Sequence, residues 1–340
     1  MRDRDQFRGC LIGGAAGDAL GYEVEFKNEK QIFSRYGERG ITAYALHDGK
    51  ALISDDTQMT LFTAAGLLLG TARGEGGIET YRGSIRDCYL DWLKTQTERF
   101  APAKGDGCSR LLNVPELFSN RAPGTTCMSA LEQGGKGSIE KPANTSKGCG
   151  GVMRAAPVGL YFNDRGKPAE EIARIGAEAA AITHGHILGW MPAAALAQMI
   201  HEISQNGDPV YDAVMKTLYT QEEMWPDSPQ KEFFLELMRR AVDLASMDKN
   251  DLEAVHRLGE GWVAEETLAI AVYCALKYEN DFDSALTASV NHRGDSDSTG
   301  AVTGNILGAR LGLSGIPEKY VKDLELKDVI LKMADDLWQG

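Results

Sequence analysis

The sequence has few cysteines, and it contains no long hydrophobic run. Its six cysteines are scattered over 340 residues without a CxxC pair. This usage indicates reduced thiols and excludes a disulfide framework or a cysteine zinc site. The longest apolar runs, at 67–69 and 191–197, are far shorter than the roughly 20 residues of a membrane span. The first five residues are too charged for a signal peptide. We therefore expect a cytoplasmic protein without a membrane partner.

The sequence also has fewer basic residues than acidic ones. Lysine and arginine total 36 against 49 aspartates and glutamates, which gives a formal net charge of −13. A chain this acidic is poorly suited to the phosphate backbone of a nucleic acid, so we do not expect nucleic acid as its main partner. The hydrophobic fraction of 43% is ordinary for a folded globular protein. No coiled-coil heptads appear, and we expect a monomer.

Segments of alternating polarity, typical of strands, are absent, whereas apolar residues at helical spacing are common. We expect helices at residues 81–94, 169–183, 190–203, 232–245, 264–278, 284–291 and 326–338. Residues 102–151 are rich in glycine, proline, serine and asparagine. We expect them to form long loops that make one wall of a cleft, because motifs flank them on both sides. The sequence thus predicts a compact all-α fold, with residues 1–340 as a single domain.

Glycine recurs every fourth residue in two segments. The positions are Gly9, Gly13, Gly17 and Gly21 in the first and Gly300, Gly304, Gly308 and Gly312 in the second. A glycine inside a helix costs about 1 kcal/mol relative to alanine, so these positions need a reason. A spacing of four places them on one helical face, where two backbones can approach closely. We predict two central helices, packed against each other or against other close neighbours. If they are antiparallel, Glu25 lies beside the start of the second helix.

Two short acidic clusters lie towards opposite ends of the chain, and each opens a predicted helix. They are Ser54-Asp55-Asp56-Thr57 and Asp295-Ser296-Asp297-Ser298-Thr299. Helix capping would explain one such residue in each cluster, but not two carboxylates with neighbouring hydroxyls. Carboxylates this close raise one another's pKa, and a hard divalent cation removes that penalty. If the fold joins the clusters, they form one oxygen-lined metal site, which we predict for two ions.

Three further patterns have features in common with known motifs. The second cluster does not continue as an EF-hand, whose loop needs a glutamate at position twelve, where this chain has Ile306. The glycine-rich segment 147–154 matches neither the P-loop nor GxGxxG, so it is either a phosphate-approaching loop or a plain turn. His184 and His186 have no cysteine or HExxH partner. We expect capping or substrate-contacting imidazoles there, not zinc ligands.

Taken in order, these motifs resemble the ADP-ribosylglycohydrolase family. The similarity rests on Gly13, Gly17, Asp18, Gly21, Glu25, Ser54 to Thr57, Gly148 to Arg154, His184 and Gly294 to Ser298, and it spans residues 9–312. The resemblance implies a compact all-α fold with two Mg²⁺ or Mn²⁺ ions in a central cleft. It also implies hydrolysis of the bond between ADP-ribose and a side chain of a modified partner protein. We favour arginine as that side chain, on overall resemblance to bacterial-type members, with serine as the alternative.

The resemblance assigns roles to single residues as well. It implies as metal ligands Ser54, Asp55, Asp56, Asp295, Asp297 and Ser298. It implies as substrate-binding residues Ser146, Lys147, Gly148, Cys149, Gly150, Gly151 and His184. The catalytic base would be Glu25, Asp56 or Asp297, with Glu25 a mobile acid near the metals. Lys147 stands where some members carry an aromatic residue, and Cys149 where some carry asparagine. Adenine stacking is therefore expected to use another residue or to be weaker, with a phosphate contact as the alternative role of Lys147.

Two other functions also fit the acidic clusters. One is a metal-dependent hydrolase of another nucleotide sugar or N-glycoside, which product analysis would distinguish. The other is a non-catalytic binder, such as an immunity protein that blocks an ADP-ribosyltransferase. A pure binder would still protect after loss of the acidic cluster, whereas a hydrolase would not.

Overall fold

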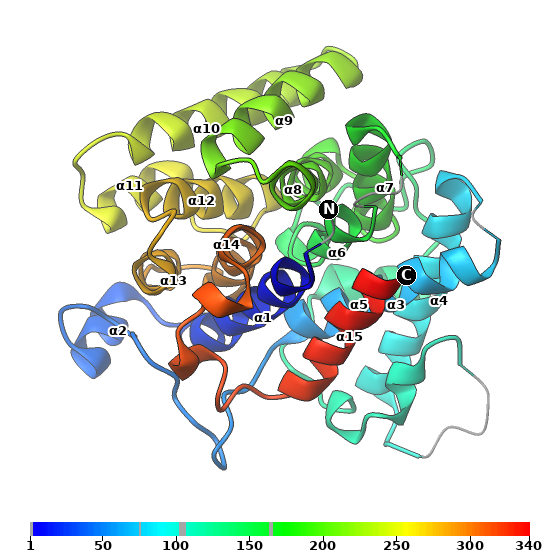
Figure 1. Cartoon of the computed structure of the whole chain (residues 1–340), viewed down its shortest axis with the longest axis horizontal. Coiled ribbons are helices and arrows are strands. Elements are labelled where there is room, and N and C mark those ends of the chain that lie inside the picture. Colours follow the sequence, from blue (N-terminus) through cyan, green and yellow to red (C-terminus); the bar gives the residue numbers. More distant parts are fainter. Residues whose placement is uncertain (1–2, 75, 102–106, 163–165) are drawn as a thin grey trace.

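The computed structural model describes residues 3–74, 76–101, 107–162 and 166–340. Within these residues the chain forms fifteen α-helices and five short 3-10 helices, and it forms no β-strand (Figure 1). The fold is all-α, as predicted. The α-helices are α1 (Arg4–Tyr22), α2 (Glu29–Tyr36), α3 (Asp55–Ala72), α4 (Ile78–Thr97), α5 (Thr125–Glu132), α6 (Ala156–Tyr161), α7 (Ala169–Ala181), α8 (Ile187–Asn206), α9 (Val210–Met224), α10 (Pro229–Ala245), α11 (Asp251–Leu258), α12 (Ala264–Lys277), α13 (Phe282–Val290), α14 (Ser296–Leu311) and α15 (Lys327–Gln339).

All seven helices predicted from apolar spacing are present, with small shifts at their ends. They correspond to α4, α7, α8, α10, α12, α13 and α15. The sequence pattern does not indicate α9, although that helix is long. Its apolar residues Tyr211, Met215 and Tyr219 are exposed. Apolar residues therefore occur on the solvent face as well as on the buried face, and the sequence shows no clear helical period.

The two glycine-rich helices α1 and α14 are antiparallel neighbours at the centre of the molecule (Figure 1). A Cβ atom added to Gly13 would lie 2.3 Å from the carbonyl oxygen of Gly304. One added to Gly17 would lie 1.9 Å from that of Gly300. No side chain fits between these backbones. The prediction of two closely packed central helices is therefore confirmed, and their antiparallel order brings the end of α1 to the start of α14.

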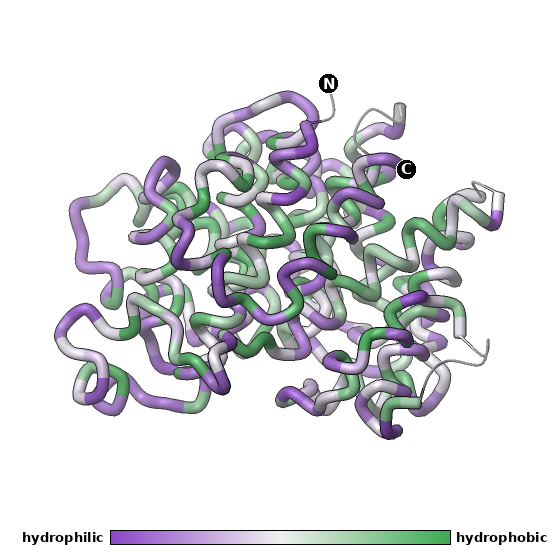
Figure 2. Tube along the Cα trace, turned by 60° about the horizontal axis from the view of Figure 1, so that its bottom comes forward, coloured by the Kyte–Doolittle hydropathy of each residue, from purple (hydrophilic) through white to green (hydrophobic). Residues whose placement is uncertain are grey.

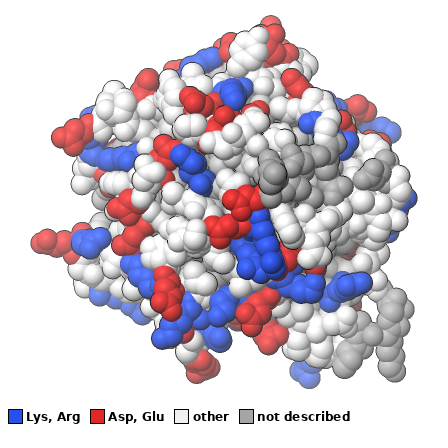
Figure 3. Space-filling view, in the orientation of Figure 1, with Lys and Arg blue, Asp and Glu red and all other residues white. Residues whose placement is uncertain are grey.

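The other helices surround this central pair. Helices α12 and α13 pack on α14, α15 packs on α1, and the pairs α3–α4 and α7–α8 extend the packing outwards. Their buried apolar side chains form one continuous core. Figure 2 shows hydrophilic segments mainly in the outer loops and turns. Acidic and basic side chains are interspersed over the face in Figure 3, so the net negative charge is not gathered in one patch there.

The loop-rich region lies between α4 and α6. Within it are three 3-10 helices, η1 (Arg110–Asn113), η2 (Pro115–Leu117) and η3 (Cys149–Gly151), and the short helix α5. Residues 122–127 and 148–150 line a cavity, which confirms that this region makes one wall of a cleft. Residues 102–106 of the predicted loop lie outside the described residues. Across the described ranges, the helices are all too short or too polar to cross a membrane.

Candidate active site

The first acidic cluster is held in place by α1. Helix α3 begins at Asp55, and the Ser54 hydroxyl oxygen caps it by accepting a hydrogen bond from the Asp56 amide at 3.1 Å. Asp18 is fully buried on α1. Its carboxylate accepts from the backbone amides of Ser54 (2.9 Å) and Thr57 (3.1 Å) and from the Thr57 hydroxyl. The Asp18 carboxylate thus connects the start of α3 to the central helix pair.

The second cluster forms the start of α14. The side chain of Asp295 caps this helix by accepting from the Ser298 amide at 3.3 Å, and Asp297 Oδ1 accepts from the same amide at 3.0 Å. The Cys149 thiol donates to Asp295 Oδ2 at 2.8 Å. The glycine-rich turn and the second cluster are therefore in direct contact, although they lie far apart in the sequence.

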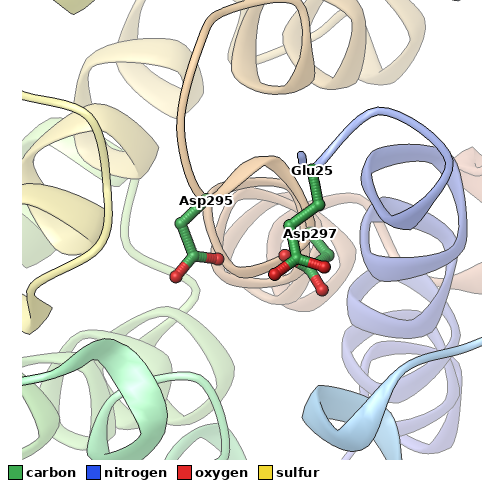
Figure 4. A group of neighbouring side chains, drawn as sticks. All are labelled: Glu25, Asp295 and Asp297. Atoms are coloured by element: carbon green, nitrogen blue, oxygen red, sulfur yellow. The ribbon is translucent and has the colours of Figure 1, made fainter. Parts of the chain in front are cut away.

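The fold brings both clusters and Glu25 into one cavity. One carboxylate oxygen from each of Glu25, Asp295 and Asp297 lies within 4.8 Å of the other two, an arrangement that can hold a metal ion. Figure 4 shows Asp295 and Asp297 at the start of α14, with Glu25 reaching them from the segment after α1. Asp55 and Asp56 line the same cavity, whose volume is about 370 Å³.

Most of the residues predicted for the site line this cavity. They are Glu25, Asp55, Asp56, Gly148, Cys149, Gly150, His184, Asp295, Asp297 and Ser298. Four of the predicted residues do not line it, namely Ser54, Ser146, Lys147 and Gly151. Ser54 is fully buried as the cap of α3. Gly151 lies behind the wall, where an added Cβ would be 2.7 Å from the carbonyl oxygen of Gly189.

The side chains of Ser146 and Lys147 have partners other than the carboxylates of the cavity. The Ser146 hydroxyl contacts the Thr126 hydroxyl at 3.1 Å and accepts from the Gly148 amide at 3.4 Å, so it stabilises the turn. Lys147 forms an ion pair with the buried Glu265. It also lines a second cavity of about 470 Å³, which adjoins the first at Trp262.

His184 and His186 have different roles, and each matches one of the two that the sequence predicts. His186 is the N-cap of α8, and its Nδ1 accepts from the Leu188 amide at 3.1 Å. His184 is buried, and its ring lines the cavity against the turn at Gly148 and Gly150. Helix capping therefore describes His186, whereas His184 is placed to contact a ligand.

Sequence reasoning missed an aromatic pair at the rim of the cavity. Phe26 stacks on Trp262 with ring centroids 6.0 Å apart, and both residues line the cavity. Phe26 is 73% exposed, which is unusual for so large an apolar side chain. The sequence alone does not distinguish Trp262 from the aromatic residues of the core, because it does not show which side chains stay at the surface.

Burial makes the carboxylate cluster electrostatically costly without a cation. Burial, with added repulsion from Asp297, raises the pKa of Glu25 to about 10 and that of Asp18 to about 7. Burial also raises the pKa values of Asp55 and Asp56 well above their usual range. Glu25 Oε2 and Asp56 Oδ2 are buried and have no hydrogen-bond partner in the described part of the chain. Bare carboxylate oxygens in such a place fit a hard divalent cation.

These shifts predict how the stability of the metal-free protein depends on pH. The pKa of Glu25 rises from an ordinary 4.5 to about 10 on folding. Between these values the folded state holds a proton that the unfolded state has lost, so stability falls as pH rises. In EDTA, the free energy of unfolding measured in urea should therefore decrease from about pH 5 to about pH 8. Added Mg²⁺ or Mn²⁺ should stabilise more at the higher pH, because the cation competes with protons.

The matched variant for this prediction is Glu25→Gln. It keeps the size of the side chain and removes one titrating group, so the decrease in stability with pH in EDTA should become shallower. A wild-type protein whose stability rises over the same pH range would contradict the assignment of these pKa shifts.

The comparison with known proteins agrees with this arrangement. The family model of the ADP-ribosylglycohydrolases matches residues 1–340. The chain belongs to the ADP-ribosylglycohydrolase family. The sequence-based resemblance is thereby confirmed, and membership indicates an enzyme that hydrolyses glycosidic linkages of ADP-ribose.

Named relatives extend over almost the whole chain. ADP-ribosylhydrolase ARH3 of Danio rerio is 26% identical over 358 residues, covering 98% of this chain and 88% of that protein. The ADP-ribosyl-(dinitrogen reductase) glycohydrolase of Rhodospirillum rubrum is 26% identical over 338 residues, covering 95% and 91%. A solved structure titled ADP-ribosylglycohydrolase-related protein complex has the same fold, with a TM-score of 0.66, 22% identity and coverage of 99% and 98%.

Proposed function

We propose that this protein is a metal-dependent hydrolase that releases ADP-ribose from modified side chains of a partner protein, with arginine as the first linkage to test. The observation that carries the proposal is the convergence of both acidic clusters and Glu25 in one cavity. Support also comes from the names of the two relatives, a hydrolase of ADP-ribosyl groups and a glycohydrolase of ADP-ribosylated dinitrogen reductase. Both relatives are 26% identical to this chain, so sequence identity to them does not favour arginine over serine as the modified side chain.

We assign the bound cations to the oxygen donors of the cavity. The proposed ligands that line the cavity are Asp55, Asp56, Asp295, Asp297 and Ser298, with Glu25 beside them. Ser54, the cap of α3 outside the cavity lining, is the sixth proposed ligand, and we propose two Mg²⁺ or Mn²⁺ ions. Oxygen-only donors suit these hard ions, and the unpartnered oxygens of Glu25 and Asp56 lack the hydrogen bonds that would otherwise stabilise them. When bound, such ions supply charge that orients ribose hydroxyls and lowers the pKa of water.

In the proposed reaction, a water oxygen bonds to the anomeric carbon of the ribose as the bond from that carbon to nitrogen breaks. The bonding electrons leave with the nitrogen, which gains a proton, and the water loses one. Glu25 or Asp56 suits the role of base, because each has a buried carboxylate oxygen free to accept that proton. Asp297 already accepts from the Ser298 amide through Oδ1. The negative cluster would also favour the positive charge that develops on the ribose.

The proposal is tested by measuring free ADP-ribose. We would incubate the protein with an ADP-ribosyl-arginine protein and an ADP-ribosyl-serine peptide, each with Mg²⁺, Mn²⁺ or EDTA. Release from one linkage in the presence of metal, and loss of release in EDTA, is the expected result. Release from neither linkage, with metal binding shown by calorimetry, would overturn the proposal. It would favour another N-glycoside, or a binding role.

A further inference from the structure

A buried guanidinium group lies directly behind the cavity wall. Arg154 is 1% exposed, and within the described ranges it forms no ion pair. Its Nη1 donates to Met59 Sδ (3.2 Å) and Cys127 Sγ (3.3 Å), and the guanidinium lies 4.4 Å from the ring centre of Tyr89. Its Nε has no partner among the described residues. A buried charge compensated so weakly is costly, so its retention calls for a function.

The remaining donor of Arg154 leads to the cavity. Nη2 donates to the Thr183 hydroxyl oxygen at 2.7 Å. The same oxygen lies 2.8 Å from His184 Nδ1. Another possible acceptor for the Thr183 hydroxyl, the carbonyl of Ala180, is 3.5 Å away. The three side chains therefore form a chain of hydrogen bonds from a buried cation to an imidazole at the cavity surface.

This chain decides which nitrogen of His184 carries a proton. The Thr183 oxygen already accepts from Arg154, which polarises its O–H bond and makes it a stronger donor. Its proton is better placed towards Nδ1 at 2.8 Å than towards the Ala180 carbonyl at 3.5 Å. Burial and the charge of Arg154 also lower the pKa of His184 to about 3, so the ring is neutral. A neutral ring that accepts at Nδ1 carries its proton on Nε2.

The Nε2 atom has no hydrogen-bond partner among the described residues. A Cβ atom added to Gly148 would lie 3.3 Å from it, which places Nε2 against the glycine turn of the cavity wall. We propose that Arg154 and Thr183 are positioning residues that hold His184 as an Nε2–H donor for a phosphate oxygen of the ligand. The charge of Arg154 behind this wall favours an anionic acceptor. The identity of the ligand in this inference rests on the proposed function, whereas the protonation state of the His184 ring does not.

The protonation state can be measured without any reaction. Long-range ¹H–¹⁵N spectra of protein labelled at histidine distinguish the two neutral forms, and His184→Gln identifies the signals. We expect the wild type to show a protonated Nε2 and a bare Nδ1 from about pH 5.5 to about pH 8. In Thr183→Val the signals should shift towards a mixture of both forms, and Thr183→Ser should restore them. A protonated Nδ1 in the wild type would overturn the inference, whatever the enzymatic activity.

Ligand binding tests the second half of the inference. By calorimetry, Thr183→Val should weaken ADP-ribose binding about tenfold, and Arg154→Lys should weaken it as well. Binding of adenosine, which has no phosphate, should change little. The control is Thr303→Val, because Thr303 is equally buried and its hydroxyl donates only to the carbonyl of Thr299. Equal losses for adenosine and ADP-ribose, or an equal loss in the control, would contradict a phosphate contact. Absence of hydrolysis with the spectra as expected would count against the proposed function alone.

Discussion

Asp297→Asn is expected to abolish metal-dependent hydrolysis while leaving the protein folded. Asp297 is buried at the start of α14, with a carboxylate oxygen within 4.8 Å of those of Glu25 and Asp295. The asparagine keeps the size of the side chain and an oxygen that can accept from the Ser298 amide. The change therefore removes charge and a proposed metal ligand, not packing. We expect the rate to fall roughly 10³-fold or more, and Mn²⁺ affinity to fall at least about 100-fold.

The stability of the same variant gives an independent measurement. Without metal, the cluster is destabilised by burial and mutual repulsion of its carboxylates. In EDTA, Asp297→Asn should therefore be at least as stable as the wild type. With saturating Mn²⁺ it should gain less stability than the wild type does. Asp243→Asn, on the exposed face of α10, is the control and should change none of these quantities. Wild-type rates in Asp297→Asn with Mn²⁺ still bound would refute the metal assignment.

Gly304→Ala is expected to destabilise the protein strongly. Its added Cβ would lie 1.9 Å from the carbonyl oxygen of Gly13, inside the contact between the two central helices. The helices would have to separate, and backbone atoms cannot move aside as a flexible side chain can. We expect a loss of about 3 kcal/mol or more in the free energy of unfolding. Thermal unfolding should show a fall in Tm of roughly 5 °C or more.

The matched control is Gly83→Ala. Gly83 is also inside a helix, α4, but a Cβ at that position would meet no atom within 4 Å. Alanine there should stabilise the protein by about 0.5–1 kcal/mol, because it has the higher helix propensity. Equal effects of the two substitutions would show that helix propensity, and not the close approach of α1 and α14, governs the glycine pattern.

Separation of the central helices should also affect the cavity. Glu25 follows α1, and the second acidic cluster begins α14, so their distance depends on the packing of the two helices. The proposed metal site is therefore coupled to a stripe of glycines that forms no part of it.

Much of the architecture could be predicted because it depends on local patterns. Apolar residues at helical spacing indicate helices such as α7 and α12, since a helix buries one face whatever its neighbours are. Glycines every fourth residue indicate a close contact between helices, because only the absence of a side chain allows it. Paired carboxylates with hydroxyls at two helix starts indicate a cation, because they exceed what capping needs. Each inference uses residues within a few turns of one another.

The placement of single side chains depended on contacts between distant segments. Asp18 holds the first cluster through Ser54 and Thr57, and Arg154 reaches His184 through Thr183, but no spacing in the sequence indicates either link. Lys147 has a partner other than the carboxylates of the cavity, because Glu265, on α12, provides its counter-ion.

The sequence by itself determined the helical class, the close central pair and the oxygen-rich chemistry of the site, since these follow from local periodicity and residue type. Only the tertiary structure decided which carboxylate oxygens lack a partner, which of the predicted site residues stay outside the cavity, and which side chains support them. These depend on the burial and direction of each side chain, and the packing of the whole chain sets both.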